Sequence, residues 1–504
     1  MTDLASILSR PIAWADGAID PALRSFLDDL QANILKGHGR HHTVNLFLGF
    51  GGMDPAEVGR VVRLLGNHCT SAYRQLRTNR KRPPHIDGGP VRCLFLTASG
   101  YRALGSGVLV PGGKAFEQGM GGRGAVLADP PRTAWNAVGW RNTPPDAMML
   151  IANATPGPLE PELEAIEGWL NGTGVKVLFV ERGLQQTRSF QKGKPEGVEH
   201  FGYVDGRSQP LVLAEDVTAE AIPPEDAEPG EKRQWDPAFS PSQFIIHDPN
   251  GHSPLSAGSY FVFRKLEQDV RGFNAAEDEL AETIFGKDAD DVQRDRAGAM
   301  VVGRFEDGTP LTLFAEEQKT DVTNDFSYAD DRDGLKCPFH AHIRKTNPRG
   351  DIERTFGTPD EGGGRDPIMI RRGITYGPER PHNADRSEFA DKGQEPRTGS
   401  GLLFMAYMAS IEAQFEFTQR SWATNPDFVR PGTGIDPVIG QTDSPAEMKH
   451  TYQDGWTGGP PVPDVGFAKF VTMQGGEYFF APSLSFLRGA GLGRSGEMPS
   501  SEMG

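Results

Sequence analysis

The chain has 504 residues, of which 37% are hydrophobic and 24% are charged, and its formal net charge at pH 7 is -16. This length favours two domains or a duplicated domain over one small core. The negative charge argues against a broad surface for nucleic acids or anionic membranes, and no apolar run approaches the roughly 20 residues that span a bilayer.

The N-terminus and the cysteines predict a cytoplasmic protein. The opening MTDLASILSR has no basic start followed by an apolar core, which is the pattern of a secretory signal. Cys69, Cys93 and Cys337 are too scattered for a disulfide framework, and no closely spaced pair suggests a zinc site.

The first half of the chain predicts the order β-α-β-β-α-β, which is that of a ferredoxin-like unit. Residues 42–50 alternate apolar side chains on one face, as a strand does. Asp54 and Pro55 are typical of a helix start, and an apolar stripe follows from Val58 to Cys69. The other elements expected here are strands at 91–99, 147–154 and 175–183 and a helix at 159–170.

The second half repeats this order with longer insertions. Two such units predict an α+β fold of two ferredoxin-like domains with mainly antiparallel sheets, at residues 1–215 and 216–490, and a flexible tail at 491–504. Segments rich in Pro, Gly or charged residues are expected to form surface or lid material, at 217–257, 347–367 and 428–465. The expected elements are strands at 258–266, 368–376, 401–409 and 476–483 and helices at 274–284 and 411–422.

Two histidine-rich segments could hold a metal. HGRHH, with His38, His41 and His42, has no carboxylate at useful spacing, so a solvated basic loop is favoured. In CPFHAHIRKTNPR, His340 and His342 would share one face of an extended segment, where either could enter a pocket as a ligand. Taken alone, this spacing favours packed core histidines.

An arginine pair and an aspartate raise a similar choice between structure and function. Arg371 and Arg372 interrupt an apolar strand, and strand parity sends them to opposite faces. An arginine on a core face needs an anion or a ligand, whereas an edge strand would leave both solvated. Asp205, in HFGYVDGRSQP, belongs to an Asp-Gly turn pair, and no local feature separates a turn role from an acid–base role.

Taken together, these segments resemble the dye-decolourising (DyP-type) haem peroxidases. The resemblance runs from about residue 28 to residue 485, and the chain length is similar to that of the larger fungal branch. It implies two ferredoxin-like domains with haem b between them. The matching segments are LQANILKGHGR, FGYVDGRSQP, VVGRFEDGTPL, CPFHAHIRKTNPRGD, IMIRRGITYGPE, GLLFMAYMASIEAQFEFTQRSW and GGEYFFAP.

The resemblance implies a role for each side chain left open above. His342, rather than His340, aligns with the family's His-Ile-Arg-Lys pattern and would be the axial ligand of the iron. Asp205 would be the acid–base residue, and Arg371 would stabilise the charge that develops on the departing peroxide oxygen.

Three further residues are implied to contact the haem or its ligand. Glu412 resembles the acidic partner of the ligand's second N–H, with an exposed helical glutamate as an equal alternative. Leu402 and Phe404 share one strand face and would form a dry wall beside the haem, which is compatible with ordinary core packing.

The implied function is a haem b peroxidase that reduces hydrogen peroxide and oxidises dyes, phenolics or other organic donors. The alternative is a haem-binding or haem-delivery protein with incidental peroxidase activity. Asp205, Arg371 and His342 together favour catalysis, because binding alone needs only a ligand and a pocket. Dyes too bulky to reach a buried haem would give their electrons at surface Trp or Tyr residues.

Overall fold

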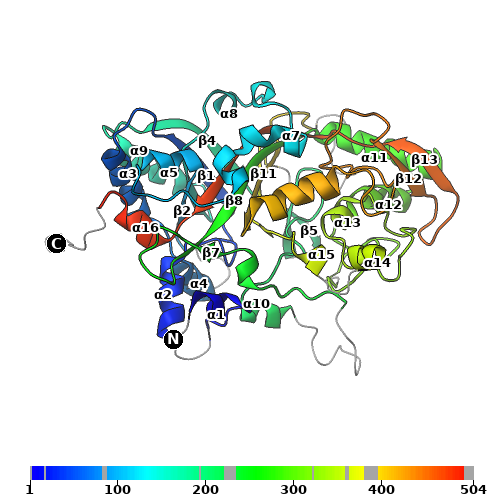
Figure 1. Ribbon diagram of the computed structural model, residues 1–504. Coiled ribbons are helices and arrows are strands. Elements are labelled where there is room, and N and C mark those ends of the chain that lie inside the picture. The colour runs from blue at the N-terminus through cyan, green and yellow to red at the C-terminus, as the bar shows by residue number, and fades with distance from the viewer. Residues whose placement is uncertain are drawn as a thin grey trace.

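An antiparallel sheet of ten strands runs through both halves of the computed structural model (Figure 1). Eight strands follow one path, and two short strands pair with its members. No described helix is both long and apolar enough to cross a membrane. The structure describes residues 3–15, 19–81, 88–191, 194–220, 234–320, 323–357, 362–379 and 395–492.

The N-terminal half forms the first predicted ferredoxin-like unit. Its strands lie in the order β4-β1-β3-β2, which is the 4-1-3-2 order of four successive strands. Asp54 caps α3 as expected, since its carboxylate accepts from Ala56 N at 2.9 Å. The elements are β1 (His42–Gly49), α3 (Pro55–Asn67), β2 (Val91–Leu96), β3 (Ala147–Asn153), α9 (Leu159–Leu170) and β4 (Lys176–Leu184).

The C-terminal half forms the second unit, with its strands in the order β10-β11-β8-β14. The strand expected at 368–376 is divided into β9 and β10, and both parts pair with β11. The helix expected at 411–422 has wide π-type turns. The elements are β8 (Ala257–Gln268), α11 (Val270–Phe285), α12 (Asp291–Val302), β9 (Ile370–Arg371), β10 (Ile374–Tyr376), β11 (Gly401–Met408), η4 (Ile411–Glu416), η5 (Thr418–Ala423) and β14 (Val471–Ala481).

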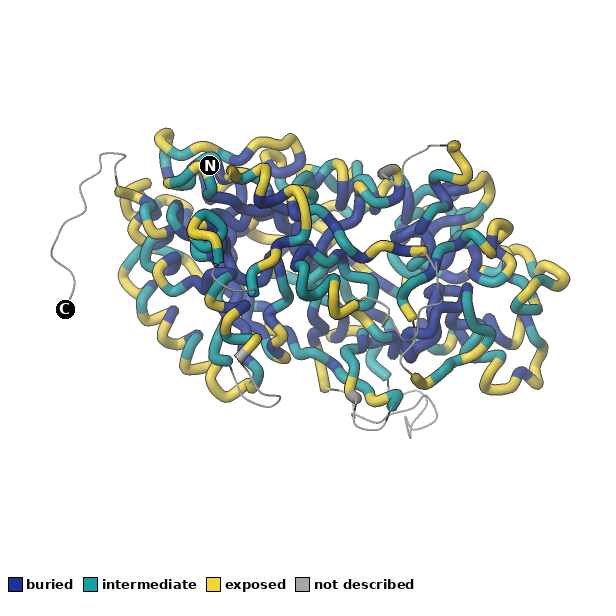
Figure 2. Tube along the Cα trace, turned by 90° about the horizontal axis from the view of Figure 1, so that it is seen from below, coloured by how far each residue is buried: buried dark blue, intermediate teal, exposed yellow. Residues whose placement is uncertain are grey.

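The two units share one sheet because β14 pairs with β2, where Phe480 lies opposite Leu96. The buried residues therefore form a core that continues from one half into the other, as the dark blue trace in Figure 2 shows. The predicted domain boundary after residue 215 falls within α10 (Ala214–Ala219) and remains a prediction.

The expected insertions differ in structure. Segment 428–465 is more than surface material, because it contains the paired strands β12 (Lys449–Gln453) and β13 (Pro461–Gly466) and the fully buried Asp436. In the other two segments, residues 221–233 and 358–361 lie outside the described residues, as does the predicted tail from residue 493 onward.

The remaining described elements are mostly short. They are α1 (Leu4–Leu8), α2 (Pro21–Asp29), α4 (Ala72–Lys81), α5 (Ala98–Ala103), α6 (Lys114–Gln118), η1 (Met120–Arg123), α7 (Gly124–Leu127), η2 (Arg132–Ala134), α8 (Val138–Asn142), β5 (Gln186–Gln191), β6 (Lys194–Val198), η3 (Pro241–Gln243), β7 (Ile246–His247), α13 (His342–Thr346), α14 (Asp351–Phe356), α15 (Gly362–Arg365) and α16 (Leu484–Gly489).

Candidate active site

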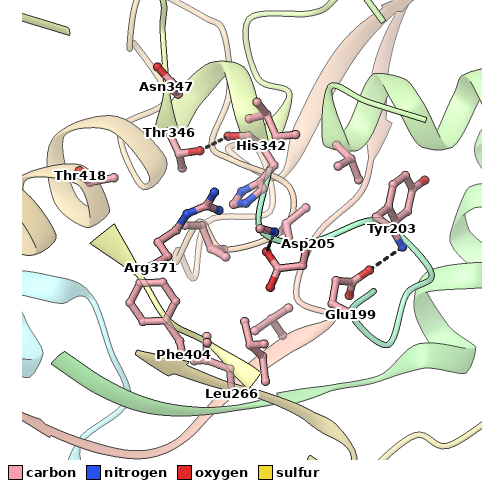
Figure 3. Close-up of a pocket in the computed structure, with 18 of the residues that line it drawn as sticks. Glu199, Tyr203, Asp205, Leu266, His342, Thr346, Asn347, Arg371, Phe404 and Thr418 are labelled. Atoms are coloured by element: carbon pink, nitrogen blue, oxygen red, sulfur yellow. Dashed lines mark hydrogen bonds between the residues drawn. The ribbon is translucent and has the colours of Figure 1, made fainter. Parts of the chain in front are cut away.

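A large cavity is bordered by the loop at residues 199–208, by α13 and η5, and by the strands β8, β9 and β11 (Figure 3). Its empty space is about 1870 Å³, including the open mouth. The loop belongs to the first predicted domain and the other elements to the second.

His342 enters this cavity from the first residue of α13. Its Nδ1 lies 2.8 Å from Oδ2 of Asp436. Because a carboxylate only accepts, Nδ1 is the donor in this contact. A neutral imidazole held in this way has its lone pair on Nε2, which is the form that binds a metal. The extended segment expected around His342 is wrong, since Ala341 ends a turn and His342 begins a helix.

Asp436 holds His342 from a tight turn in the insertion at 428–465. Its Oδ1 accepts from Val438 N at 2.8 Å and from Ile439 N at 3.0 Å. These backbone bonds hold the carboxylate in the orientation in which Oδ2 contacts the imidazole. Glu412, predicted for this role, lies elsewhere, because its Oε1 accepts from Ala115 N at 2.7 Å. The sequence offers one signal for Asp436: it is an acidic residue among the apolar residues of GIDPVIG, which indicates a buried carboxylate.

His340 does not line the cavity. It is buried, and its ring centroid lies 4.5 Å from that of His450 and 4.8 Å from that of Tyr452. Burial lowers the pKa of His340 well below its usual range, so the imidazole is neutral. For His340, the core-packing interpretation of the sequence is therefore confirmed.

Asp205 both shapes a turn and faces the cavity (Figure 3). Its Oδ1 accepts from the N–H of Gly206 at 2.6 Å, and Gly206 has a φ of 90°, a conformation that favours glycine. Asp205 N donates to Gly197 O at 2.9 Å, which fixes the loop against β6. The turn thus directs an exposed carboxylate at the same space as the His342 imidazole.

Glu199, which the sequence did not single out, organises the loop that leads to Asp205. Its carboxylate accepts from Phe201 N at 2.9 Å and from Tyr203 N at 3.0 Å, and also from the Gln268 side chain. These bonds occupy the Glu199 oxygens, so this carboxylate supports the loop at the cavity wall.

Arg371 and Arg372 point to opposite faces, as strand parity predicted. Arg371 lines the cavity, and its Nη2 donates to Arg207 O at 2.8 Å, which ties it to the loop that carries Asp205. Arg372 is anchored on the other face, where it donates to Asn33 O at 2.9 Å and to Ile34 O at 3.2 Å. Burial lowers the pKa of Arg372 to about 10.

The walls of the cavity suit a flat apolar ring with charged groups on its rim. Leu402 and Phe404 are two positions apart in β11, so they share one face of the strand, and both line the cavity. Arg207, Arg264 and Arg304 also line it. Buried Nε atoms of Arg207 and Arg264 have no hydrogen-bond partner among the described residues, whereas their Nη2 atoms pair with Glu196 and Asp129. With Nε2 of His342, this donor set fits haem.

The histidines of HGRHH lie apart from this cavity. His38 is buried rather than solvated, its Nδ1 accepts from Arg40 N at 3.0 Å, and burial lowers its pKa to about 3. The expected solvated loop is therefore wrong at His38, although His41 is exposed. In the described part of the chain, no three His, Cys, Asp or Glu residues are placed to hold a metal ion.

The whole chain is similar to curated peroxidases. It is 42% identical over 494 residues to the multifunctional dye peroxidase DyP2 of Amycolatopsis sp., covering 95% of this chain and 99% of that protein. It is 31% identical over 395 residues to the dye-decolorizing peroxidase msp1 of Mycetinis scorodonius, covering 74% of this chain and 71% of that one. No family model matches the chain.

Solved structures agree with these relatives. DyP2 from Amycolatopsis sp. superposes with a TM-score of 0.84 at 40% identity, over 97% of this chain and 100% of that one. A dye-decolorizing peroxidase in complex with 2,6-dimethoxyphenol superposes with a TM-score of 0.70 at 26% identity, over 94% of this chain and 100% of that one.

Proposed function

Because the chain belongs to the dye-decolourising peroxidase family, we propose that it is a haem b peroxidase that reduces hydrogen peroxide to water with electrons from organic donors. The observation that carries this proposal is the contact of 2.8 Å between His342 Nδ1 and Asp436 Oδ2. This contact would leave Nε2 for iron in the cavity that Asp205 and Arg371 also line.

In this proposal, the chain's own residues would hold the haem. His342 would bind the iron, and its bond to Asp436 would strengthen the imidazole as a donor. Leu402 and Phe404 would lie against the ring, and Arg207 and Arg264 would lie near its carboxylates. The bound haem would supply the iron and the electrons for peroxide reduction, and the organic donors would replace those electrons.

Asp205 and Arg371 act on the peroxide. The Asp205 carboxylate would take a proton from hydrogen peroxide and return it to the oxygen that leaves as water. The positive charge of the Arg371 guanidinium would stabilise the negative charge that develops on the departing oxygen. The bond from Arg371 Nη2 to Arg207 O sets the guanidinium beside the Asp205 loop.

The proposed donors are dyes and phenols. Two observations support this class: the name of the 42% identical dye peroxidase and the complex of a related peroxidase with 2,6-dimethoxyphenol. A haem-delivery protein, the alternative expected from the sequence, needs a ligand and a pocket but neither Asp205 nor Arg371. Both side chains line the cavity, which favours the peroxidase.

Replacing each of two neighbouring histidines tests the proposal. His342→Ala should lose most of its haem, measured as the pyridine haemochromogen per mole of purified protein. His340→Ala is the matched control and should keep its haem, because His340 packs against His450 and Tyr452 outside the cavity. Full haem content in His342→Ala would contradict the proposed ligand.

A further inference from the structure

A buried glutamate of α11 has no part in the proposed reaction. Glu277 is fully buried, on the face of α11 that also buries Phe273 and Leu280. Glutamate is almost never fully buried unless it is paired, because the loss of water costs free energy that an apolar side chain would not lose. Its place in the core therefore indicates a role other than packing.

The Glu277 carboxyl group is bound by the loop that carries Asp205 (Figure 3). The hydroxyl of Tyr203 donates to Glu277 Oε1 at 2.5 Å, and Tyr203 is itself buried. A hydrogen bond between two groups removed from water holds them in one geometry, since breaking it leaves buried polar atoms unsatisfied. The bond thus ties the loop of the first predicted domain to a helix of the second.

A glycine in α12 leaves the space that this bond needs. A β-carbon added at Gly298 would lie 2.2 Å from the Tyr203 hydroxyl and 2.4 Å from Glu277 Oε1, which is closer than non-bonded heavy atoms approach. Glycine in a helix interior lowers helix stability relative to alanine. The loop, α11 and α12 therefore each contribute one residue to a single contact.

The anchor at Tyr203 lies two positions before Asp205. Val204 N donates to Glu306 O at 2.9 Å and Asp205 N donates to Gly197 O at 2.9 Å, so backbone bonds already hold this stretch on two sides. The Tyr203 hydroxyl adds a third attachment, to α11. A shift of Tyr203 away from α11 would therefore also move the Asp205 backbone.

We propose that Tyr203 and Glu277 are positioning residues, which hold the Asp205 carboxylate where it can exchange a proton with peroxide. Proton transfer needs the two heavy atoms to lie within ~2.6–3.2 Å of each other, so a small shift of the loop lowers its rate. A misplacement of ~1 Å can cost about 10²-fold in rate. This inference rests on the proposed acid–base role of Asp205.

Two substitutions that break the bond test the inference. Tyr203→Phe removes the donor, and Gly298→Ala places a methyl group between the two side chains. In both variants, the peroxide reaction of the haem-loaded protein should slow by about 10–100-fold in stopped-flow absorbance, with unchanged haem content. Cyanide binding to the ferric protein should slow as well, because hydrogen cyanide must also give up a proton. That second readout involves no turnover.

A conservative variant and a matched control accompany them. Glu277→Gln keeps an oxygen for the Tyr203 hydroxyl and should react at close to the wild-type rates. Tyr478→Phe should leave both rates unchanged, because Tyr478 is buried and donates to Glu416 Oε1 at 3.0 Å but neither residue lines the cavity. Wild-type rates in both Tyr203→Phe and Gly298→Ala would overturn the inference.

A double variant separates positioning from stability. Tyr203→Phe alone leaves the buried Glu277 carboxyl without this donor and should destabilise the fold. Tyr203→Phe combined with Glu277→Leu removes both polar groups and should recover stability in denaturant. We expect the double variant to stay slow with peroxide and cyanide, because the loop is still detached from α11. Recovery of both rates together with stability would reduce the bond to a structural contact and overturn the inference.

Amide hydrogen exchange in the haem-free protein separates this inference from the proposed function. The peptide that contains Val204 and Asp205 should exchange faster in Tyr203→Phe than in wild type, because one attachment of the loop is lost. Unchanged exchange would overturn the inference and leave the proposed function intact. Wild-type protein that binds haem but does not react with peroxide would refute the proposed function, and the inference with it.

Discussion

At the scale of single residues, Asp205 has two separable contacts. Its Oδ1 accepts from Gly206 N, and the carboxylate faces the cavity. Asp205→Asn keeps an oxygen for the Gly206 bond but cannot take a proton. We expect this variant to keep its fold and haem and to react with peroxide about 10²–10⁴-fold more slowly, measured by stopped-flow absorbance.

A second Asp-Gly pair provides the matched control for Asp205. Asp333 is exposed and followed by Gly334, which has a φ of 68°, but Asp333 does not line the cavity. Asp333→Asn should leave the peroxide rate unchanged. Equal rates in Asp205→Asn and in wild type would reduce Asp205 to a turn residue.

Sequence motifs identified three of the residues that line the cavity. Asp205, His342 and Arg371 each sit in a short recognisable segment, and all three line one cavity. The partner of His342 could not be found in this way, because Asp436 is 94 positions away and its turn has no such motif. Glu412 was expected as this partner because its segment resembles that of the family, but its carboxylate accepts from a backbone N–H of α6.

At the scale of elements, strand parity at β9 sends adjacent arginines to different surroundings. Arg372 anchors the strand to the Asn33–Ile34 backbone, whereas Arg371 faces the cavity. Arg372→Leu should lower the free energy of unfolding by roughly 1.5–3 kcal/mol, because charged hydrogen bonds to two carbonyls are lost. Arg371→Leu should slow the peroxide reaction with a smaller loss of stability.

Denaturant unfolding and stopped-flow absorbance, applied to both variants, check this division. Each variant is the control for the other, since the same side chain is removed at neighbouring positions. A larger stability loss in Arg371→Leu than in Arg372→Leu would contradict the assignment of the two faces.

Apolar periodicity located the regular elements because burial on one face imposes it. Predicted strand 42–50 is β1, and predicted helix 159–170 is α9. The extended form expected for His340 and His342 failed because tertiary contacts decide that segment. Arg344, two residues after His342, is buried in ion pairs with Asp331 and Asp351, which a local pattern does not reveal.

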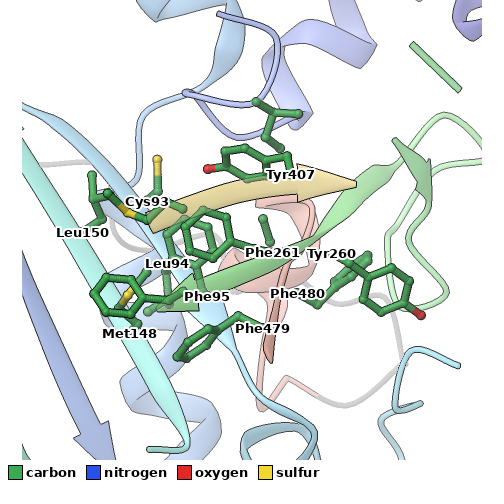
Figure 4. Packing of buried hydrophobic residues seen from close by; sticks show 14 of the residues in the cluster. Cys93, Leu94, Phe95, Met148, Leu150, Tyr260, Phe261, Tyr407, Phe479 and Phe480 are labelled. Carbon is green, nitrogen blue, oxygen red and sulfur yellow. The ribbon is translucent and has the colours of Figure 1, made fainter. Parts of the chain in front are cut away.

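At the scale of the whole molecule, the junction of β2 and β14 is packed by rings from both halves (Figure 4). Phe95 of β2 stacks on Phe261 of β8, with ring centroids 4.4 Å apart, and both are fully buried. Phe95→Ala should destabilise the protein by about 3–5 kcal/mol. Because the core is continuous, haem release and the loss of helical circular dichroism should shift together.

Separate midpoints for haem release and for helix loss in Phe95→Ala would indicate that the halves unfold independently. The sequence did not predict that the two units share one sheet. Each unit could be predicted from its own order of elements, but the contact between Phe480 and Leu96 joins residues far apart in the chain.

Buried neutral histidines should make the protein sensitive to acid. Burial lowers the pKa of His38 to about 3 and that of His450 to about 4, from an ordinary value of 6.5. Their stabilising contribution is complete above pH ~6.5 and declines as the pH falls, because the unfolded chain takes up these protons first. For each group, the free energy of unfolding should fall by about 1.4 kcal/mol per pH unit between pH ~6.5 and the lowered pKa.

Unfolding by denaturant at pH 7, 6 and 5 measures this slope. His38→Gln should show a shallower loss of stability in acid than wild type, because one of these groups is absent. If the free energy of unfolding fell equally with pH in both proteins, His38 would not be a buried histidine with a lowered pKa.

The most direct test of the central claim is an absorption spectrum of the full chain reconstituted with hemin, recorded before and after one equivalent of hydrogen peroxide. The arrangement of His342, Asp205 and Arg371 predicts a Soret band that changes rapidly on addition of peroxide and returns when a phenolic donor follows. Protein that stays colourless, or a Soret band that peroxide leaves unchanged, would contradict the account.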